Sequence, residues 1–117
     1  MTKILLVDDD PITKTLLKTL LEMEGFNVTP WDLGTDVMDN LQTEKPDLVV
    51  MDVNLNGLNG IDVLRNIRAE QKFQDVCIIM SSGMNYEDEC TKEGANGFLL
   101  KPYMPDDLIQ LIRKNLS

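Results

Sequence analysis

The sequence predicts an α/β fold in which helices cover both faces of a parallel sheet. Short apolar runs typical of strands alternate with longer stretches whose apolar residues recur every three or four positions, as they do in helices. Strands that alternate with helices in this way join through crossovers and lie parallel. The 117 residues are also the usual length of one compact domain, so we expect a single domain over residues 1–117.

The first strand and the helix after it have clear sequence boundaries. An apolar run predicts a strand over residues 3–7. Asp10 and Pro11 then predict the start of a helix, because an aspartate side chain accepts hydrogen bonds from free helix amides and proline needs no partner in the first turn. We expect Gly25 to end this helix.

The next two strands differ in their expected place in the sheet. The second strand, residues 26–31, contains Pro30, which lacks the amide donor of a strand ladder and is tolerated best at an edge. A short helix is expected at 36–42. The third strand, residues 48–52, is apolar at successive positions, which indicates burial on both faces and a central place in the sheet.

The rest of the chain repeats this alternation. We expect, in order, a loop at 54–59, a helix at 61–68, a strand at 76–80, a helix at 86–93, a strand at 98–100 and an amphipathic helix at 106–116. Right-handed crossovers and an edge position for the second strand give the strand order 2-1-3-4-5, a flavodoxin-like arrangement of five βα units. Such sheets bind ligands at the carboxyl ends of their strands, beside the switch point between the first and third strands.

Carboxylates follow both strands that flank this switch point. Asp8, Asp9 and Asp10 come directly after the first strand, and the third strand ends on Asp52. Two carboxylates about 4 Å apart repel each other by roughly 4 kcal/mol at an effective dielectric near 20. A hard divalent cation with oxygen ligands removes that repulsion. We therefore expect a metal ion at this edge of the sheet.

Composition excludes several other classes of function. The chain has 20 Asp plus Glu against 11 Lys plus Arg, a net charge of −9 and no basic cluster, so we expect no direct binding to nucleic acid. No apolar run has transmembrane length, and the amino terminus becomes acidic too soon for a signal peptide. Cys77 and Cys90 lack the spacing of a metal knuckle or redox pair, so we expect reduced thiols in a cytoplasmic protein without a membrane partner.

Four motifs, each at the end of a predicted strand, together resemble the receiver domain of two-component response regulators. They are VDDDP at 7–11, VVMD at 49–52 with Gly60 eight residues beyond, IIMSS at 78–82, and FLLKPY at 98–103. The resemblance covers essentially the whole chain. In length the chain resembles the stand-alone regulators of the chemotaxis type.

This resemblance implies a phosphorylation-dependent signalling switch in which Asp52 accepts a phosphoryl group. The chain contains no histidine, so the phosphohistidine donor would belong to a partner, either a histidine kinase or a histidine phosphotransfer protein. The resemblance also implies Mg²⁺ bound by Asp9 and Asp52, by Asp8 mainly through water, and by the backbone carbonyl of Asn54. Such a protein is not an enzyme with a separate substrate, since it catalyses only its own phosphorylation and dephosphorylation.

The resemblance assigns roles to three further residues. Lys101 would neutralise the transferred group together with Mg²⁺, and Ser81 would hydrogen-bond a phosphoryl oxygen and move toward it as the conformational trigger. Ser82 is the alternative; we favour Ser81 because an apolar run, Ile78 to Met80, leads directly to it. Phe98 stands where the family often places an aromatic residue that turns inward, although a Phe that opens a strand is commonly a core residue.

The resemblance also predicts the surface that binds a downstream protein and the lifetime of the phosphorylated state. A downstream protein would bind the face of the fourth helix, fifth strand and fifth helix, which would include Phe98, Tyr103, Met104 and parts of 86–92. The loop after Asp52 has Asn56 where the family usually has proline, so we expect this loop to be mobile without its cation. Neutral residues two positions after Asp52 and Ser81, namely Asn54 and Gly83, lead us to expect a phosphate lifetime of seconds to minutes.

Three other functions fit parts of the sequence. In a haloacid-dehalogenase-like phosphatase, Asp8 would be the nucleophile and Asp10 its partner, but the chain lacks room for a cap and a late acidic pair. A flavodoxin-like nucleotide-binding module needs a first loop rich in Gly, Ser and Thr, whereas three aspartates there would repel phosphate. A receiver-like docking module that is never phosphorylated would not need the full set of acids, hydroxyl and lysine that the chain retains.

Overall fold

A five-stranded parallel sheet forms the centre of the structure, a computed structural model that describes residues 2–32 and 34–116. The strand order is β2-β1-β3-β6-β7. Counted along the chain without the short β4 and β5, this is the predicted order 2-1-3-4-5, with the Pro30 strand at one edge. The strands are β1 (Lys3–Val7), β2 (Asn27–Pro30), β3 (Leu48–Asp52), β6 (Cys77–Ser82) and β7 (Gly97–Leu100).

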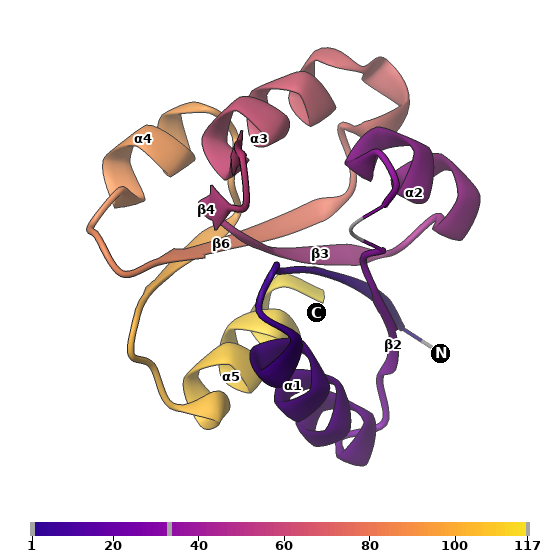
Figure 1. Cartoon of the computed structure of the whole chain (residues 1–117), viewed down its shortest axis with the longest axis vertical. Coiled ribbons are helices and arrows are strands. Elements are labelled where there is room, and N and C mark those ends of the chain that lie inside the picture. Colours follow the sequence, from indigo (N-terminus) through magenta and orange to yellow (C-terminus); the bar gives the residue numbers. More distant parts are fainter. Residues whose placement is uncertain (1, 33, 117) are drawn as a thin grey trace.

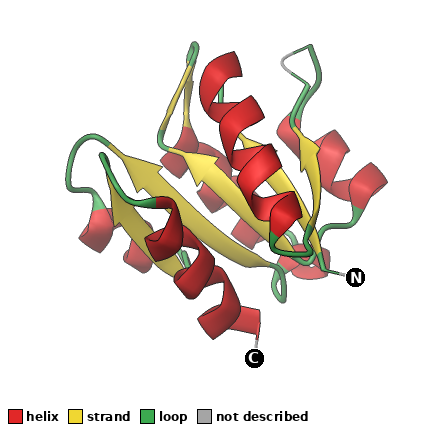
Figure 2. Cartoon of the chain, turned by 90° about the horizontal axis from the view of Figure 1, so that it is seen from below, coloured by secondary structure: helices red, strands yellow, loops and turns green. Residues whose placement is uncertain are grey.

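Helices cover both faces of the sheet, as predicted. Figure 1 shows α1 (Pro11–Met23) and α5 (Pro105–Leu116) below the sheet, and α2 (Val37–Glu44), α3 (Gly60–Ala69) and α4 (Glu87–Lys92) above it. In Figure 2, which views the molecule from below, α1 and α5 lie in front of the strands. A short 3₁₀ helix, Gln71–Phe73, follows α3. No helix within the described residues is both long and apolar enough to cross a membrane.

Alternation of side chains along the strands divides the buried residues into two cores. Leu5 and Val49 face the α2/α3/α4 core, which those three helices cover, whereas Leu6 and Val50 face the α1/α5 core. All five residues of β3 are buried, as its unbroken apolar run predicted. This alternation also fixes which way each residue at the carboxyl end of a strand points.

Capping residues set the ends of the helices. The Asp10 carboxylate accepts hydrogen bonds from the Ile12 amide at 3.2 Å and the Thr13 hydroxyl at 2.6 Å, so its predicted capping role is confirmed. Gly25, with a φ of +95°, follows α1 and takes the left-handed conformation that ends helices.

Two features near the predicted site differ from expectation. The fourth strand of the sheet, β6, extends through Ser81 and Ser82 instead of ending before them. The expected loop at 54–59 is an antiparallel hairpin, β4 (Asn54–Leu55) and β5 (Leu58–Asn59), because Leu55 is buried and Gly57 turns the chain with a φ of +77°. The other elements differ from their predicted bounds only near their ends.

Candidate functional site

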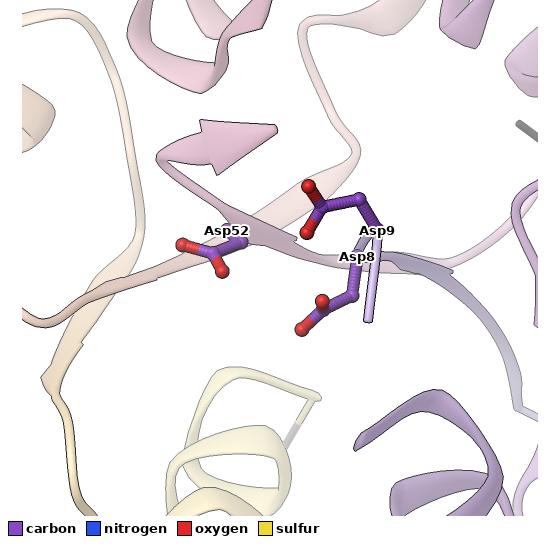
Figure 3. Close-up of side chains that lie close together, drawn as sticks. All are labelled: Asp8, Asp9 and Asp52. Atoms are coloured by element: carbon purple, nitrogen blue, oxygen red, sulfur yellow. The ribbon is translucent and has the colours of Figure 1, made fainter. Parts of the chain in front are cut away.

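Three carboxylates meet at the carboxyl edge of the sheet. Val7 and Met51 are partners in the β1·β3 ladder, so the residues that follow them, Asp8 and Asp52, emerge side by side. Asp8, Asp9 and Asp52 each offer an oxygen atom, and these atoms all lie within 4.8 Å of one another (Figure 3). Asp8 and Asp52 are only 4% and 7% exposed. Their negative charges are therefore crowded in a place that water reaches poorly.

Lys101 is the cation of this cluster. It follows β7, and its Nζ lies 2.7 Å from Asp52 Oδ2 and 3.9 Å from Asp8 Oδ2. Burial by itself would lower the pKa of Lys101, but the hydrogen bond to Asp52 and the charges of Asp52, Asp8 and Asp9 outweigh burial and raise the pKa. Lys101 therefore stays positively charged at neutral pH.

The acids keep excess negative charge despite this lysine. Burial raises the pKa of Asp8, although the Asp10 amide, which donates to Asp8 Oδ1 at 2.9 Å, and the charge of Lys101 act in the opposite direction. Asp52 Oδ1 accepts from the Asn54 amide at 3.1 Å. Three acids beside one lysine leave an uncompensated charge that a divalent cation would balance.

The donor set fits Mg²⁺. Carboxylate oxygens on a rigid strand end are the hard ligands that this small cation prefers, and a few protein ligands suffice because it keeps several waters. The structure brings Asp8, Asp9 and Asp52 together but separates Asp10, whose carboxylate caps α1. Asn54 begins β4 directly after the site, and its carbonyl group stays a predicted ligand.

Strand register distinguishes the two candidate serines. Ser81 is the ladder partner of Asp52, so the two side chains leave the sheet on the same side, that of the α1/α5 core. Ser82 points to the other side, where its Oγ accepts from the Met84 amide at 3.1 Å. Both serines are buried. The Ser81 side chain thus lies on the same face of the sheet as Asp52, whereas Ser82 holds the β6–α4 loop through its hydrogen bond with Met84.

The two predicted aromatic residues lie on opposite sides of the sheet. Phe98 pairs with Met80 and packs, half-buried, against the α2/α3/α4 core. Tyr103, expected on a partner surface, instead packs partly buried against the α1/α5 core. Burial, with a contribution from the charges of Asp8 and Asp52, raises the pKa of Tyr103 to about 12.

Gly60 supports the site in a way that sequence reasoning did not find. A Cβ atom at Gly60 would collide with the carbonyl oxygen of Asp52 and would lie 2.8 Å from the Cα of Val53. The Gly60 amide also donates to the Val53 carbonyl at 2.6 Å. The start of α3 therefore packs directly on the backbone of the phosphoacceptor candidate. The spacing of eight residues from Asp52 was visible in the sequence, but its steric reason was not.

Comparison with known proteins identifies the family. Residues 4–113 match the model of the response regulator receiver domain, and the chain belongs to this family. Among curated proteins it is 32% identical to the DNA-binding response regulator MtrA of Mycolicibacterium smegmatis over 97% of this chain and 50% of MtrA. It is 33% identical to the cell cycle transcriptional regulator CtrA of Caulobacter vibrioides over 94% of this chain and 48% of CtrA. The chain thus spans about half the length of these relatives.

Solved structures agree with this assignment. The BeF₃-activated N-terminal receiver domain of Klebsiella pneumoniae RstA superposes with a TM-score of 0.89 at 27% identity, covering 99% of both chains. The chemotaxis response regulator CheY4 of Vibrio cholerae has the same fold, with a TM-score of 0.88 at 24% identity and 98% coverage of both chains.

Membership of this family defines the general function. Receiver domains are phosphoryl-accepting signalling modules of two-component systems; they work with histidine kinases and typically use Mg²⁺. The predicted family, fold and signalling role are therefore confirmed, and the phosphatase and nucleotide-binding alternatives are disfavoured. That the chain works as a stand-alone domain stays a prediction.

Proposed function

We propose that Asp52 is the residue that accepts the phosphoryl group, from a phosphohistidine on a histidine kinase or histidine phosphotransfer protein. The observation that supports this assignment is that Asp52 lies within 4.8 Å of Asp8 and Asp9, measured between carboxylate oxygens, and 2.7 Å from Lys101 Nζ. A carboxylate so placed has a nucleophilic oxygen, a lysine beside it that neutralises charge, and two further acids that could hold a cation. The chain has no histidine, so another molecule must provide the donor.

In the proposed reaction an Asp52 oxygen attacks the phosphorus, the bond from phosphorus to the imidazole nitrogen breaks, and the leaving imidazole keeps the electron pair. Lys101 binds an oxygen of the transferred group, and its contact with Asp52 loosens as the new bond forms. Asp9, Asp52, the Asn54 carbonyl and, mainly through water, Asp8 would hold Mg²⁺, which would supply positive charge for the phosphoryl oxygens. The Ser81 hydroxyl donates to a phosphoryl oxygen, and Phe98 turns inward as that hydroxyl moves.

Exposed apolar side chains support a protein as the donor. Within the described residues, the large exposed apolar side chains other than Met23 lie on elements that surround the carboxyl edge of the sheet: Ile12, Leu16, Leu58, Met84, Leu100 and Met104. Apolar side chains that surround a charged site mark a protein-binding surface. Met104, 67% exposed, belongs to the face of α4, β7 and α5 through which we propose that the signal passes to a target protein.

We further propose that the chain itself does not bind nucleic acid, because its net charge is −9. DNA binding by MtrA is a property of a protein about twice as long.

Cys77 and Cys90 are free thiols, which supports a cytoplasmic location. We propose a phosphoaspartate lifetime of seconds to minutes, and no catalytic turnover beyond phosphorylation and dephosphorylation of Asp52.

The direct test is to incubate the protein with Mg²⁺ and acetyl phosphate and to look for one acid-stable, base-labile modification by mass spectrometry. Asp52→Asn should abolish this modification, whereas the matched variant Asp10→Asn should retain it, because asparagine also caps helices. Full modification of Asp52→Asn would overturn the assignment. Turnover of a phosphate ester that depends on Asp8 but not on Asp52 would instead support the phosphatase alternative. Decay of the modified protein with a half-life of many hours would contradict the proposed lifetime.

A further inference from the structure

Three asparagines in the chain precede glycine: Asn56-Gly57, Asn59-Gly60 and Asn96-Gly97. Such pairs are chemically labile, since glycine has no side chain to shield its backbone nitrogen. That nitrogen can attack Cγ of the asparagine side chain, so that a new C–N bond forms and the side-chain nitrogen leaves as ammonia. Water then opens the cyclic imide at either carbonyl and leaves aspartate or isoaspartate. The reaction needs a free glycine amide and a backbone that can rotate.

The fold protects two of the three pairs. Asn59 caps α3, its Oδ1 accepting from the Ile61 amide at 2.8 Å, and the amide of the buried Gly60 donates to the Val53 carbonyl. The first bond holds the Asn59 side chain, which would be attacked, and the second holds the Gly60 nitrogen, which would attack it.

Asn96 is held just as firmly. Its Oδ1 accepts from Arg68 Nη2 at 2.9 Å and from the Ile78 amide at 2.8 Å. Gly97 is the first residue of β7 and the ladder partner of Ile79. Leu111 also lies so close to Gly97 that a Cβ atom there would stand 2.9 Å from it. Asn59 and Asn96 are exposed, as Asn56 is. Their hydrogen bonds, and not burial, are therefore what protects them and distinguishes them from Asn56.

Asn56 has none of this protection. Asn56 and Gly57 are both exposed at the tip of the β4–β5 hairpin, and within the described residues no hydrogen bond uses the Asn56 side chain or the Gly57 amide. The hairpin is only two residues long on each side, so few bonds resist its rotation.

We propose that Asn56 is a site of spontaneous deamidation, the one Asn-Gly pair that the fold leaves reactive. The reaction adds a negative charge to the β4–β5 hairpin, which follows Asp52 in the chain. In the isoaspartyl product it also lengthens the backbone by one atom.

The test is to age the folded protein in mildly alkaline buffer and to map the products by peptide mass spectrometry. We expect Asn56 to deamidate several-fold faster than Asn59 and Asn96. In urea-unfolded protein the three pairs should react at similar rates, because only the fold distinguishes them. Equal rates in the folded protein, or faster reaction at Asn59 or Asn96, would overturn the proposal.

Two variants sharpen this experiment. Asn56→Gln should remove most of the deamidation of the folded protein, because the longer side chain closes its ring far less readily. Gly57→Ala should slow the reaction at Asn56; its new Cβ has no neighbour within 4 Å, although the φ of +77° disfavours alanine. Unchanged deamidation in the folded Asn56→Gln variant would contradict the assignment.

The effect on signalling rests on the proposed function of Asp52. The variant Asn56→Asp, which carries the charge of the product, should slow modification by acetyl phosphate several-fold, since added negative charge repels the anionic donor. An unchanged rate would contradict this effect while leaving the deamidation result intact, and absence of Asp52 modification in the unaltered protein would contradict the proposed function instead.

Discussion

Lys101 Nζ and Asp52 Oδ2 lie 2.7 Å apart although 49 residues separate them in the chain. The contact joins the ends of β3 and β7, which are not neighbours in the sheet, across the intervening strand β6. A buried acid and a partly buried base thus pair before any phosphoryl group arrives. The proposed phosphorylation of Asp52 would replace this pair, so the contact would link the chemistry at Asp52 to the position of β7.

Lys101→Met should lower the free energy of unfolding at neutral pH by roughly 1–3 kcal/mol, because it leaves buried Asp8 and Asp52 without their cation. Urea unfolding with and without Mg²⁺ measures this change, and added Mg²⁺ should recover part of the loss. Lys18→Ala, which removes an exposed pair with Glu22, is the control and should change the free energy by only about 0.3–0.5 kcal/mol. Equal effects of the two substitutions would contradict a central role for Lys101.

Asp8→Asn should stabilise the metal-free protein at neutral pH. Burial raises the pKa of Asp8 in the folded state, so the folded state binds the proton more tightly than the unfolded state does. Stability from this group is present below its unfolded pKa and is lost as the pH rises through the higher folded pKa. The gain in Asp8→Asn should therefore disappear in acid, which urea unfolding at a series of pH values in EDTA can measure. A gain that is independent of pH would be inconsistent with this account.

Mg²⁺ should stabilise the folded protein, by about 2.7 kcal/mol when its concentration is a hundred times the dissociation constant. Asp9→Asn should weaken this stabilisation because it removes one carboxylate of the cluster. Asp10→Asn should leave it nearly unchanged, because that side chain caps α1. Thermal unfolding across a Mg²⁺ titration gives both values, and equal losses in the two variants would place Asp10 in the metal site.

Gly60→Ala should cost about 1–3 kcal/mol of stability, because the new methyl group collides with the backbone of Asp52 and Val53. It should also slow phosphorylation by displacing Asp52. Gly83→Ala is a matched control near the same edge, since its Cβ would have no neighbour within 4 Å. Chemical unfolding and acetyl phosphate labelling of both variants test the contact; a fully stable Gly60→Ala variant would show that α3 can shift away without cost.

The two serines should separate in their effects. Ser81→Ala should slow modification of Asp52 and leave the hydrogen bonds of the β6–α4 loop intact. Ser82→Ala should retain modification but lose about 1 kcal/mol of stability, because the Met84 amide loses its acceptor. Labelling rates and unfolding free energies of both variants test these roles. Slower labelling in Ser82→Ala and a loss of stability without slower labelling in Ser81→Ala would assign the phosphoryl contact to Ser82 instead.

Patterns that depend on neighbouring residues were sufficient to predict much of the fold. The unbroken apolar run of β3, the proline in β2 and the Asp10-Pro11 pair each report on the local backbone, and together they predict the strand order and the start of α1. The meeting of acids at one edge followed from that order alone, because parallel strands deliver their carboxyl ends to the same side.

Tertiary structure decided the details of the site. The choice between Ser81 and Ser82 depends on the register of β6 against β3, and a shift of one residue would exchange them. The hairpin after Asp52 forms because Leu55 finds a place in a core built by distant segments. The sequence by itself determined which chemical groups reach the edge of the sheet. Packing and register, which join residues far apart in the chain, decided which of those groups face one another.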